Sequence, residues 1–553
     1  MKYLKPKLFE CMKDYSKGQF AKDVVAGIIV AIIALPLSIA LAIASGVSPE
    51  VGLFTAVIAG FFISFAGGSR VQIGGPTAAF VVIVAGIVAD NGLSGLIIAT
   101  ILAGIFLVLM GIFKFGSLIK YIPHTITAGF TCGIGVTLLV GQLKDFLGLD
   151  IQSVPSEFIP KVIAYAKNIT TVNFWALGIG MLSLIILIVF PKINKTIPAS
   201  IVAIIISTFV VWVFKLDAVP TIGSVFGELS SSLPVPSIPK VSFAQIKDLI
   251  SPAFTIAILA AIESLLSCVV SDSMVNDKHN PNAELIGQGL GNIFSGLFGG
   301  IPATGAIART AANVANGGRT PIAGIVHSIT LLLITLLLMP LVSLIPMTTL
   351  AAVLLVVAWN MCGWKSFINL IRTSPKSDML IAVMTFVLTV VFDLVVAIEV
   401  GIVAAAILLM YRMANVTEVK GWKYTDDNDV SEEESKKLLK LPKEIRVFEI
   451  SGPLFFAAAD KIATIKFSES VKVIIVRMKS VPSIDASAMR TLNALCDRAS
   501  ERGIKLVFSH VNSQPLTVMQ KDGFYNRIGE DGFLPDINSA VQYAKDIVTK
   551  DKE

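Results

Sequence analysis

The stretch QIGGPTAAFVVIV at residues 72–84 and the stretch GGIPATGAIARTAAN at residues 299–313 share one pattern. Each places two adjacent glycines and a proline shortly before a run of small residues. Glycine and proline interrupt an apolar helix, because proline lacks a backbone donor and glycine is conformationally free. Both stretches therefore predict short, broken helices within their surroundings.

Those surroundings are strongly apolar. The chain of 553 residues is 54% hydrophobic and 15% charged, and its mean hydropathy is +0.78, whereas soluble proteins carry about 25% charged residues. We predict an all-α polytopic membrane domain of about 14 transmembrane segments, since each span needs roughly 20 apolar residues. The candidate segments lie near 23–44, 50–66, 75–89, 93–113, 118–141, 172–190, 197–215, 250–271, 284–299, 303–316, 320–345, 347–361, 378–396 and 397–412.

The two broken segments are the third and the tenth of this series, so they correspond if the chain consists of two halves of seven. Because seven is odd, the second half would cross the bilayer in the inverted sense. Broken segments at matching places in two halves indicate a transporter binding site. Lys and Arg in short loops place both termini in the cytoplasm of a multi-pass protein of the inner (plasma) membrane. The basic segment 1–22 lacks the features of a cleaved signal peptide.

The starts of the two broken helices predict an anion site. A helix N-terminus has unpaired N–H groups and a partial positive charge, so two that face each other attract an anion without any charged side chain. The alternative is close helix packing by small residues. The predicted substrate-binding residues at the two starts are Thr77, Ala78, Ala79, Thr304, Gly305 and Ala306.

Two ionisable residues lie within apolar segments. Glu263 and Ser267 share one face of the eighth segment and predict a site for a coupling H⁺ or Na⁺, the only metal ion considered. Arg309 in the tenth segment adds fixed positive charge to the anion site. The alternative for Glu263 and Arg309 is a structural ion pair with each other.

The chain changes character after Tyr411. Residues 413–440 are polar and are predicted as a linker after a transport domain at 23–412. In 441–553, strand-like runs at 445–451, 471–478 and 505–511 alternate with helix-like sequence and predict a small α/β domain.

These residues resemble the SulP (sulfate permease) family with a C-terminal STAS domain. The resemblance also rests on DVVAGIIVAIIALPLSIALAIASGV (23–47), KHNPNAELIGQGLGNIFSGLFGG (278–300) and GPLFFAAAD (452–460). It implies a 7+7 inverted repeat divided into core and gate domains, an elevator-like movement between them, a cytoplasmic STAS domain and a homodimer.

Within the family, AIESLLS (261–267) and AIARTAANV most resemble the bacterial, proton-linked dicarboxylate subgroup. The resemblance implies proton-coupled uptake of a dicarboxylate such as succinate or fumarate, or of sulfate. Bicarbonate transporters of the family carry Asp at the position of Glu263 and use Na⁺, so a Na⁺-coupled bicarbonate transporter is the alternative. A channel, or an anion sensor that signals through the STAS domain, is the alternative of another class.

Other classes lack support in the sequence. No P-loop, nucleophile–base arrangement or metal-binding motif indicates an enzyme or a cofactor. The net charge of +6 sits mainly in loops and tails, which gives no reason to expect nucleic acid as a partner. Ser487 in SIDASAM matches a regulatory phosphosite of related anti-sigma antagonists, and the alternative is a helix N-cap formed by Asp485 or Ser487.

Overall fold

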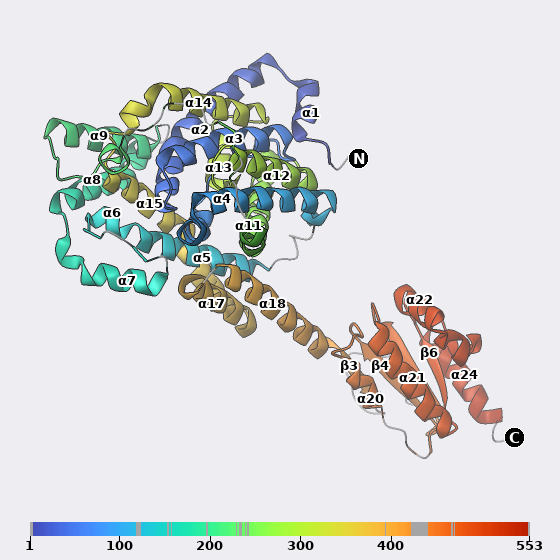
Figure 1. Ribbon diagram of the computed structural model, residues 1–553. Coiled ribbons are helices and arrows are strands. Elements are labelled where there is room, and N and C mark those ends of the chain that lie inside the picture. The colour runs from blue at the N-terminus through green and yellow to red at the C-terminus, as the bar shows by residue number, and fades with distance from the viewer. Residues whose placement is uncertain are drawn as a thin grey trace. The chain divides into compact units, whose positions relative to one another are not determined.

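The computed structural model describes residues 4–117, 123–151, 154–155, 157–194, 197–227, 229, 231, 235–237, 239, 243–392, 394–421, 441–465, 468 and 470–550. The chain divides into two compact units, Met1–Ile402 and Val403–Glu553. Figure 1 shows helices throughout the first unit, and a sheet flanked by helices in the second.

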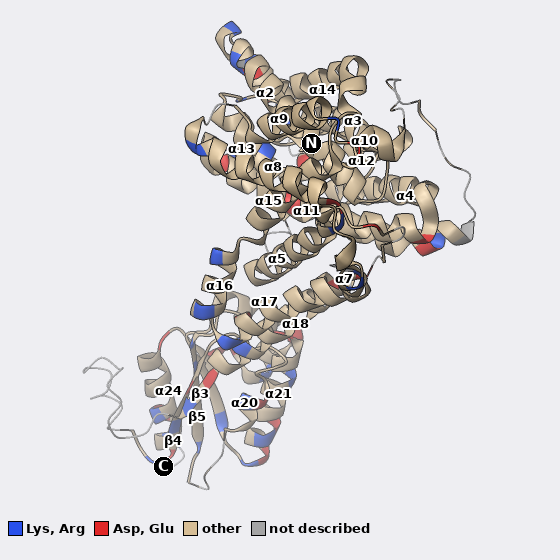
Figure 2. Ribbon diagram, turned by 90° about the vertical axis from the view of Figure 1, so that its left-hand side faces the viewer, with Lys and Arg blue, Asp and Glu red and all other residues tan. Residues whose placement is uncertain are grey.

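Long apolar helices dominate the first unit. Within the described residues, nine helical stretches are long and apolar enough to cross a membrane. Figure 2 shows Lys and Arg near several helix ends, such as the start of α2, while most of the long helices carry uncharged residues. The helices that build these stretches are α2 (Lys17–Ala44), α3 (Pro49–Ala66), α4 (Val81–Ile112), α5 (His124–Gly141), α8 (Phe174–Ile193), α11 (Phe243–Val275), α14 (Ile322–Val342), α15 (Met347–Cys362) and α18 (Leu394–Val416).

Shorter helices complete the unit, and every predicted apolar segment contains helix within its described residues. The predicted segments 75–89 and 93–113 correspond to two helical stretches on either side of Gly92, whose backbone is non-helical with φ of 65°, and both are labelled α4. The first six residues of segment 75–89 precede α4. The shorter helices are α1 (Lys7–Cys11), α6 (Leu143–Leu147), α7 (Phe158–Lys167), α9 (Ala199–Val213), α10 (Ile222–Phe226), α12 (Pro281–Leu297), α13 (Ile307–Ala315), α16 (Trp364–Thr373) and α17 (Lys376–Val391).

Two very short strands join the two broken segments. β1 (Gly74–Gly75) pairs antiparallel with β2 (Thr304–Gly305), so that Gly74 lies opposite Gly305 and Gly75 opposite Thr304. The 3₁₀ turn η3 (Ala78–Phe80) and α4 follow β1, and α13 follows β2. Because the paired strands are antiparallel, the chain leaves this crossing in opposite directions, as two inverted halves would require.

The backbones of helices α4 and α12 approach each other so closely that only glycine fits at the contact. A Cβ atom added to Gly104 of α4 would lie 2.6 Å from the carbonyl oxygen of Gly289 in α12, and one added to Gly289 would lie 2.6 Å from that of Gly104. Small residues that permit such close backbone approach are typical of membrane helix interfaces. The helix that carries the first broken segment is thereby held against α12.

We expect Gly104→Val to lower the free energy of unfolding by roughly 1–3 kcal/mol, because the added methyl groups overpack this contact. Thermal unfolding of the purified protein in detergent measures the effect as a lower Tm. Gly178→Val is the matched control, since a Cβ at Gly178 of α8 would meet nothing within 4 Å. Equal Tm values for the two variants would contradict the tight packing of α4 on α12.

The second unit is the predicted small α/β domain. Its five-stranded sheet has the order β3-β4-β5-β6-β7, in which β3 is antiparallel to β4 and the other neighbours are parallel. The strands are β3 (Glu418–Gly421), β4 (Ile445–Ser451), β5 (Val473–Ser480), β6 (Lys505–Ser509) and β7 (Phe533–Leu534), and the helices are α20 (Asp460–Ala463), α21 (Ala486–Glu501), α22 (Ser513–Asp522), α23 (Phe524–Ile528) and α24 (Ile537–Lys550).

Alternate residues of β5 enter two separate cores. Ile474 and Val476 pack with Leu492 of α21, whereas Val473 and Ile475 pack with residues of α24. Successive strand residues point to opposite faces, so each face of the sheet is covered by helices. The predicted linker 413–440 is described only in part. Its first residues belong to α18, which ends at Val416, and to β3 of the sheet. Residues 422–440 lie outside the described residues.

Candidate functional site

The residues predicted to bind an anion lie at the crossing of the two broken segments. Thr77 precedes η3 in an extended conformation, and the buried Ala78 and Ala79 form its first turn. Thr304 and Gly305 form β2 rather than the helix itself, and Ala306 is the N-cap of α13. The structure therefore brings both predicted groups together, and the first amides of α13 itself are those of Ile307 and Ala308.

The start of α13 is accessible. The side chains of Ile307 and Ala308 are exposed, and those of Ala306 and Thr77 are partly exposed. The first N–H groups of a helix have no intrahelical partner and carry its partial positive charge. The start of α13 thus offers an accessible end of positive polarity, and the start of η3 lies at the same crossing.

Arg309 lies between these two starts. Its side chain is 3% exposed, and Nη2 donates a hydrogen bond of 2.9 Å to the carbonyl oxygen of Pro76, immediately before η3. Nη1 is buried and has no hydrogen-bond partner among the described residues. A Cβ added to Gly75 would lie 2.3 Å from Nη1, so the absence of a side chain at Gly75 makes room for the guanidinium. A charged donor group is left unpaired at the crossing.

Glu263 reaches the same crossing from α11. Glu263 is partly exposed as a residue, and its Oε2 accepts a hydrogen bond of 3.1 Å from the Thr77 hydroxyl. The ion pairs among the described residues do not include one between Glu263 and Arg309. The alternative interpretation, a structural ion pair, is therefore not realised in this conformation.

Gln72, which sequence reasoning did not select, connects three elements of the site. Its Nε2 donates to the carbonyl oxygen of Ser264 at 3.1 Å, and its Oε1 accepts from the Ser267 hydroxyl at 2.8 Å and from the Thr310 hydroxyl at 3.4 Å. A Cβ at Gly305 would lie 1.6 Å from Nε2, so only glycine leaves room for this amide. The signal available in the sequence was a polar amide two residues before the first glycine pair.

The network revises the predicted polar face of α11. The Ser267 hydroxyl is buried and points to Gln72, and Ser271 bonds only to the Cys268 carbonyl of its own helix. Ser264, which was not predicted, bonds to the Thr304 hydroxyl at 2.6 Å and accepts from the Gly305 N–H at 3.2 Å. Ser264 and Ser267 therefore hold the crossing, while Glu263 faces Thr77.

We expect Gln72→Leu and Ser267→Ala to destabilise the protein non-additively, because each removes one end of the same buried hydrogen bond. Coupling energies of roughly 0.5–3 kcal/mol are found for such neighbours. Thermal unfolding of the single and double variants measures the coupling. Gln72→Leu with Ser271→Ala should be additive, because Ser271 does not contact Gln72. Additivity for both pairs would show that Ser267 acts independently of Gln72.

Comparison with known proteins assigns the chain. Residues 20–385 match the family model described as "Sulfate permease family", and residues 437–542 match that of the STAS domain. The chain belongs to the sulfate permease family. This is a family of membrane transporters and not of enzymes, which confirms the predicted family and the predicted absence of an enzymatic role.

Relatives of this sulfate permease family member align over nearly its whole length. The "Putative sulfate transporter YvdB" of Bacillus subtilis is 38% identical over 527 residues, which cover 94% of this chain and 97% of that protein. The "Bicarbonate transporter BicA" of Picosynechococcus sp. is 30% identical over 541 residues, which cover 94% of each.

Solved structures show the same fold. The murine Slc26a9 anion transporter in the inward-facing state superposes with a TM-score of 0.89 at 19% identity, over 98% of this chain and 94% of that one. The transmembrane domain of a cyanobacterial BicA superposes with a TM-score of 0.64 at 31% identity, over 69% of this chain and 98% of that one. A helical membrane domain followed by an α/β STAS domain is thereby confirmed.

In the STAS domain, Asp485 is the N-cap of α21. Its Oδ1 accepts from the Ala488 N–H at 2.8 Å and its Oδ2 from the Phe456 N–H at 2.9 Å. Ser487 lies exposed in the first turn of α21. Asp485 therefore performs the capping function. Phosphorylation of Ser487 stays a prediction. Unchanged transport by Ser487→Asp would count against it.

Proposed function

We propose that this chain is a secondary active transporter of sulfate or bicarbonate, and that the anion binds between the starts of η3–α4 and α13. The observation that carries the proposal is the buried Arg309, whose Nη1 has no partner among the described residues. A permanently charged group with an unpaired donor, beside two helix N-termini, favours an anion. The relatives described above are named for sulfate and bicarbonate, so we propose these anions as substrates in preference to a dicarboxylate.

The proposal gives Glu263 the coupling role. A proton or Na⁺ on its carboxylate offsets the charge of the anion, since charges of opposite sign are easier to move through a low-dielectric barrier together. The Thr77 hydroxyl bonds to Glu263 at 3.1 Å, so the cation and anion sites share one segment. Ser267 acts indirectly in this scheme, because its hydroxyl holds Gln72 at 2.8 Å.

The proposal includes the architecture predicted from the sequence. Fourteen helical segments, seven in each inverted half, would cross the membrane with both termini in the cytoplasm. A core domain carrying the crossing of β1 and β2 would move against a gate domain in an elevator-like manner, in a homodimer. The antiparallel pairing of Gly74–Gly75 with Thr304–Gly305 supports the inverted arrangement.

Uptake into proteoliposomes tests the function. Labelled sulfate, bicarbonate and succinate are supplied in turn, each with an imposed pH gradient or an imposed Na⁺ gradient. We expect sulfate or bicarbonate to accumulate above its equilibrium level with one of the gradients. Accumulation of succinate alone would restore the dicarboxylate prediction and refute the substrate proposed here.

The same experiment separates the other classes. Anion flux that neither saturates nor responds to either gradient would identify a channel. Binding of an anion without any flux would identify a sensor. Either result would contradict secondary active transport.

A further inference from the structure

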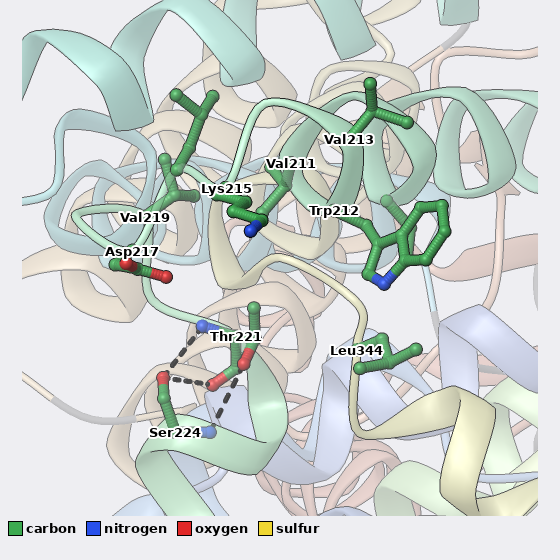
Figure 3. A pocket seen from close by; sticks show the side chains of 11 residues that line it. Val211, Trp212, Val213, Lys215, Asp217, Val219, Thr221, Ser224 and Leu344 are labelled. Atoms are coloured by element: carbon green, nitrogen blue, oxygen red, sulfur yellow. Dashed lines mark hydrogen bonds between the residues drawn. The ribbon is translucent and has the colours of Figure 1, made fainter.

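A pocket of about 760 Å³ lies apart from the crossing, between the end of α9, residues 214–221, α10 and the turn after α14. Figure 3 shows Trp212, Lys215 and Asp217 around it, and Leu344 on the separate chain segment that follows α14. Backbone hydrogen bonds fix its shape, from Ile222 N–H to the Ile345 carbonyl at 2.9 Å and from Gly223 N–H to the Ser343 carbonyl at 2.7 Å. These bonds hold two of the chain segments that line the pocket against each other.

The pocket carries one positive and one negative side chain. Lys215 and Asp217 are the charged residues among its described lining residues, both are exposed, and neither forms an ion pair within the described part of the chain. Lys215 adopts a left-handed conformation with φ of 48°, which is unfavourable for any residue other than glycine. Two unpaired charges of opposite sign fit a zwitterionic ligand.

Two hydroxyls that line the pocket, those of Thr221 and Ser224, are already engaged with each other's backbone. Thr221 and Ser224 form a reciprocal capping box, with Ser224 N–H bonded to Thr221 Oγ1 at 3.2 Å and Thr221 N–H bonded to Ser224 Oγ at 2.9 Å. Ser224 also donates its own proton to the Thr221 carbonyl at 2.9 Å. Recognition of charge therefore falls to Lys215 and Asp217.

Most of the other lining residues are apolar, and Thr208 is an exception. Thr208 lies on α9 about one and a half turns before the helix ends, and its buried Oγ1 has no hydrogen-bond partner among the described residues. Val211, Val219 and Leu344 line the pocket beside it, and Trp212 is 68% exposed at the end of α9. Two charges, an exposed indole and apolar side chains in one lining are the kinds of group that meet the headgroup, the interface and the acyl chain of a phospholipid.

The short length of α9 also brings lipid headgroups close to the pocket at its end. Its 15 residues span roughly 22 Å, less than the about 30 Å of a hydrocarbon core. A short span thins the bilayer locally and draws headgroups inward.

We propose that this pocket binds the headgroup of a zwitterionic phospholipid with a primary ammonium, such as phosphatidylethanolamine. Its phosphate faces Lys215, and its ammonium donates hydrogen bonds to Asp217. A choline headgroup fits less well because its ammonium has no N–H donor.

Tryptophan quenching in proteoliposomes tests this. The full chain is reconstituted in phosphatidylcholine vesicles that contain, at equal mole fraction, brominated phosphatidylethanolamine, brominated phosphatidylcholine or brominated phosphatidylglycerol. The difference between the protein and its Trp212→Phe variant isolates the signal of Trp212. We expect brominated phosphatidylethanolamine to be preferred over phosphatidylcholine by about fivefold, the scale of one partly exposed charge pair.

The variants decide the outcome. Lys215→Ala and Asp217→Asn should each reduce the preference to nearly none, whereas Lys167→Ala, which removes an exposed lysine of α7, should leave it intact. Equal quenching of Trp212 by all three lipids would overturn the proposal. So would equal or stronger quenching by phosphatidylglycerol that survives in Asp217→Asn, because this would show only general attraction of anionic lipid to Lys215.

Discussion

Replacing Arg309 with alanine is expected to reduce the initial rate of anion uptake by about thirtyfold or more. Removing one partner of a buried, charged hydrogen bond costs roughly 2–5 kcal/mol. Here the change removes the charge at the crossing and the donor Nη1, and it leaves the Pro76 carbonyl without its 2.9 Å bond. Uptake by proteoliposomes over a range of anion concentrations measures the effect as a rise in KM or a loss of the maximal rate.

Two further variants make the result interpretable. Arg309→Lys keeps the charge but cannot place one donor on Pro76 and another towards the anion, so we expect intermediate uptake. Arg372→Ala removes an exposed arginine from the last turn of α16 and should leave uptake unchanged. Wild-type kinetics in Arg309→Ala, with correct folding shown by size-exclusion chromatography, would remove Arg309 from the anion site.

Replacing Glu263 with glutamine is expected to abolish gradient-driven accumulation while exchange of anion across the membrane continues. Glutamine has nearly the same shape, and its amide oxygen still accepts the hydrogen bond from Thr77, so the crossing stays intact. It can neither take up a proton nor compensate a Na⁺ ion. Counterflow of labelled anion without a gradient, compared with accumulation under a gradient, separates the two activities.

Glu399→Gln is the matched control for this variant. Glu399 is an exposed carboxylate in another apolar helix, α18, and it belongs to none of the contacts that build the crossing. We expect this variant to accumulate anion normally. Retained accumulation in Glu263→Gln would show that the coupling ion binds elsewhere.

Much of the fold could be predicted from local sequence. The helices follow from the apolar segments, and the α/β tail follows from IRVFEIS, which is β4 at Ile445–Ser451. The break between the predicted third and fourth segments is present at Gly92, where the backbone is non-helical within α4. The start of the third segment was less certain, because Gly75 belongs to β1 and Ala78–Phe80 to η3 before α4 begins at Val81.

The site was predictable only in part. Glycine and proline in the two quoted stretches identified the crossing, because they mark interrupted helices. The roles of Gln72 and Ser264 could not be deduced in this way, since these two residues bond to each other across 192 positions of the chain. The register of β1 on β2 decides which side chains meet, and local sequence carries no information about that long-range pairing. For the same reason, the bond of Ser267 to Gln72 was not foreseen, and Ser267 was predicted only as a coupling-ion residue beside Glu263.

The most direct test of the central claim asks whether the transported anion occupies the start of α13. Ala308→Cys and Ala315→Cys place single thiols at the two ends of this helix, both at exposed positions, in a background without the five native cysteines. The rate of alkylation of each thiol is measured with increasing concentrations of the anion that proteoliposomes take up. At about ten times the dissociation constant, we expect alkylation at Ala308→Cys to slow by about tenfold through occupancy, and alkylation at Ala315→Cys to stay unchanged. Unchanged alkylation of Ala308→Cys at anion concentrations that saturate uptake would contradict the proposed site.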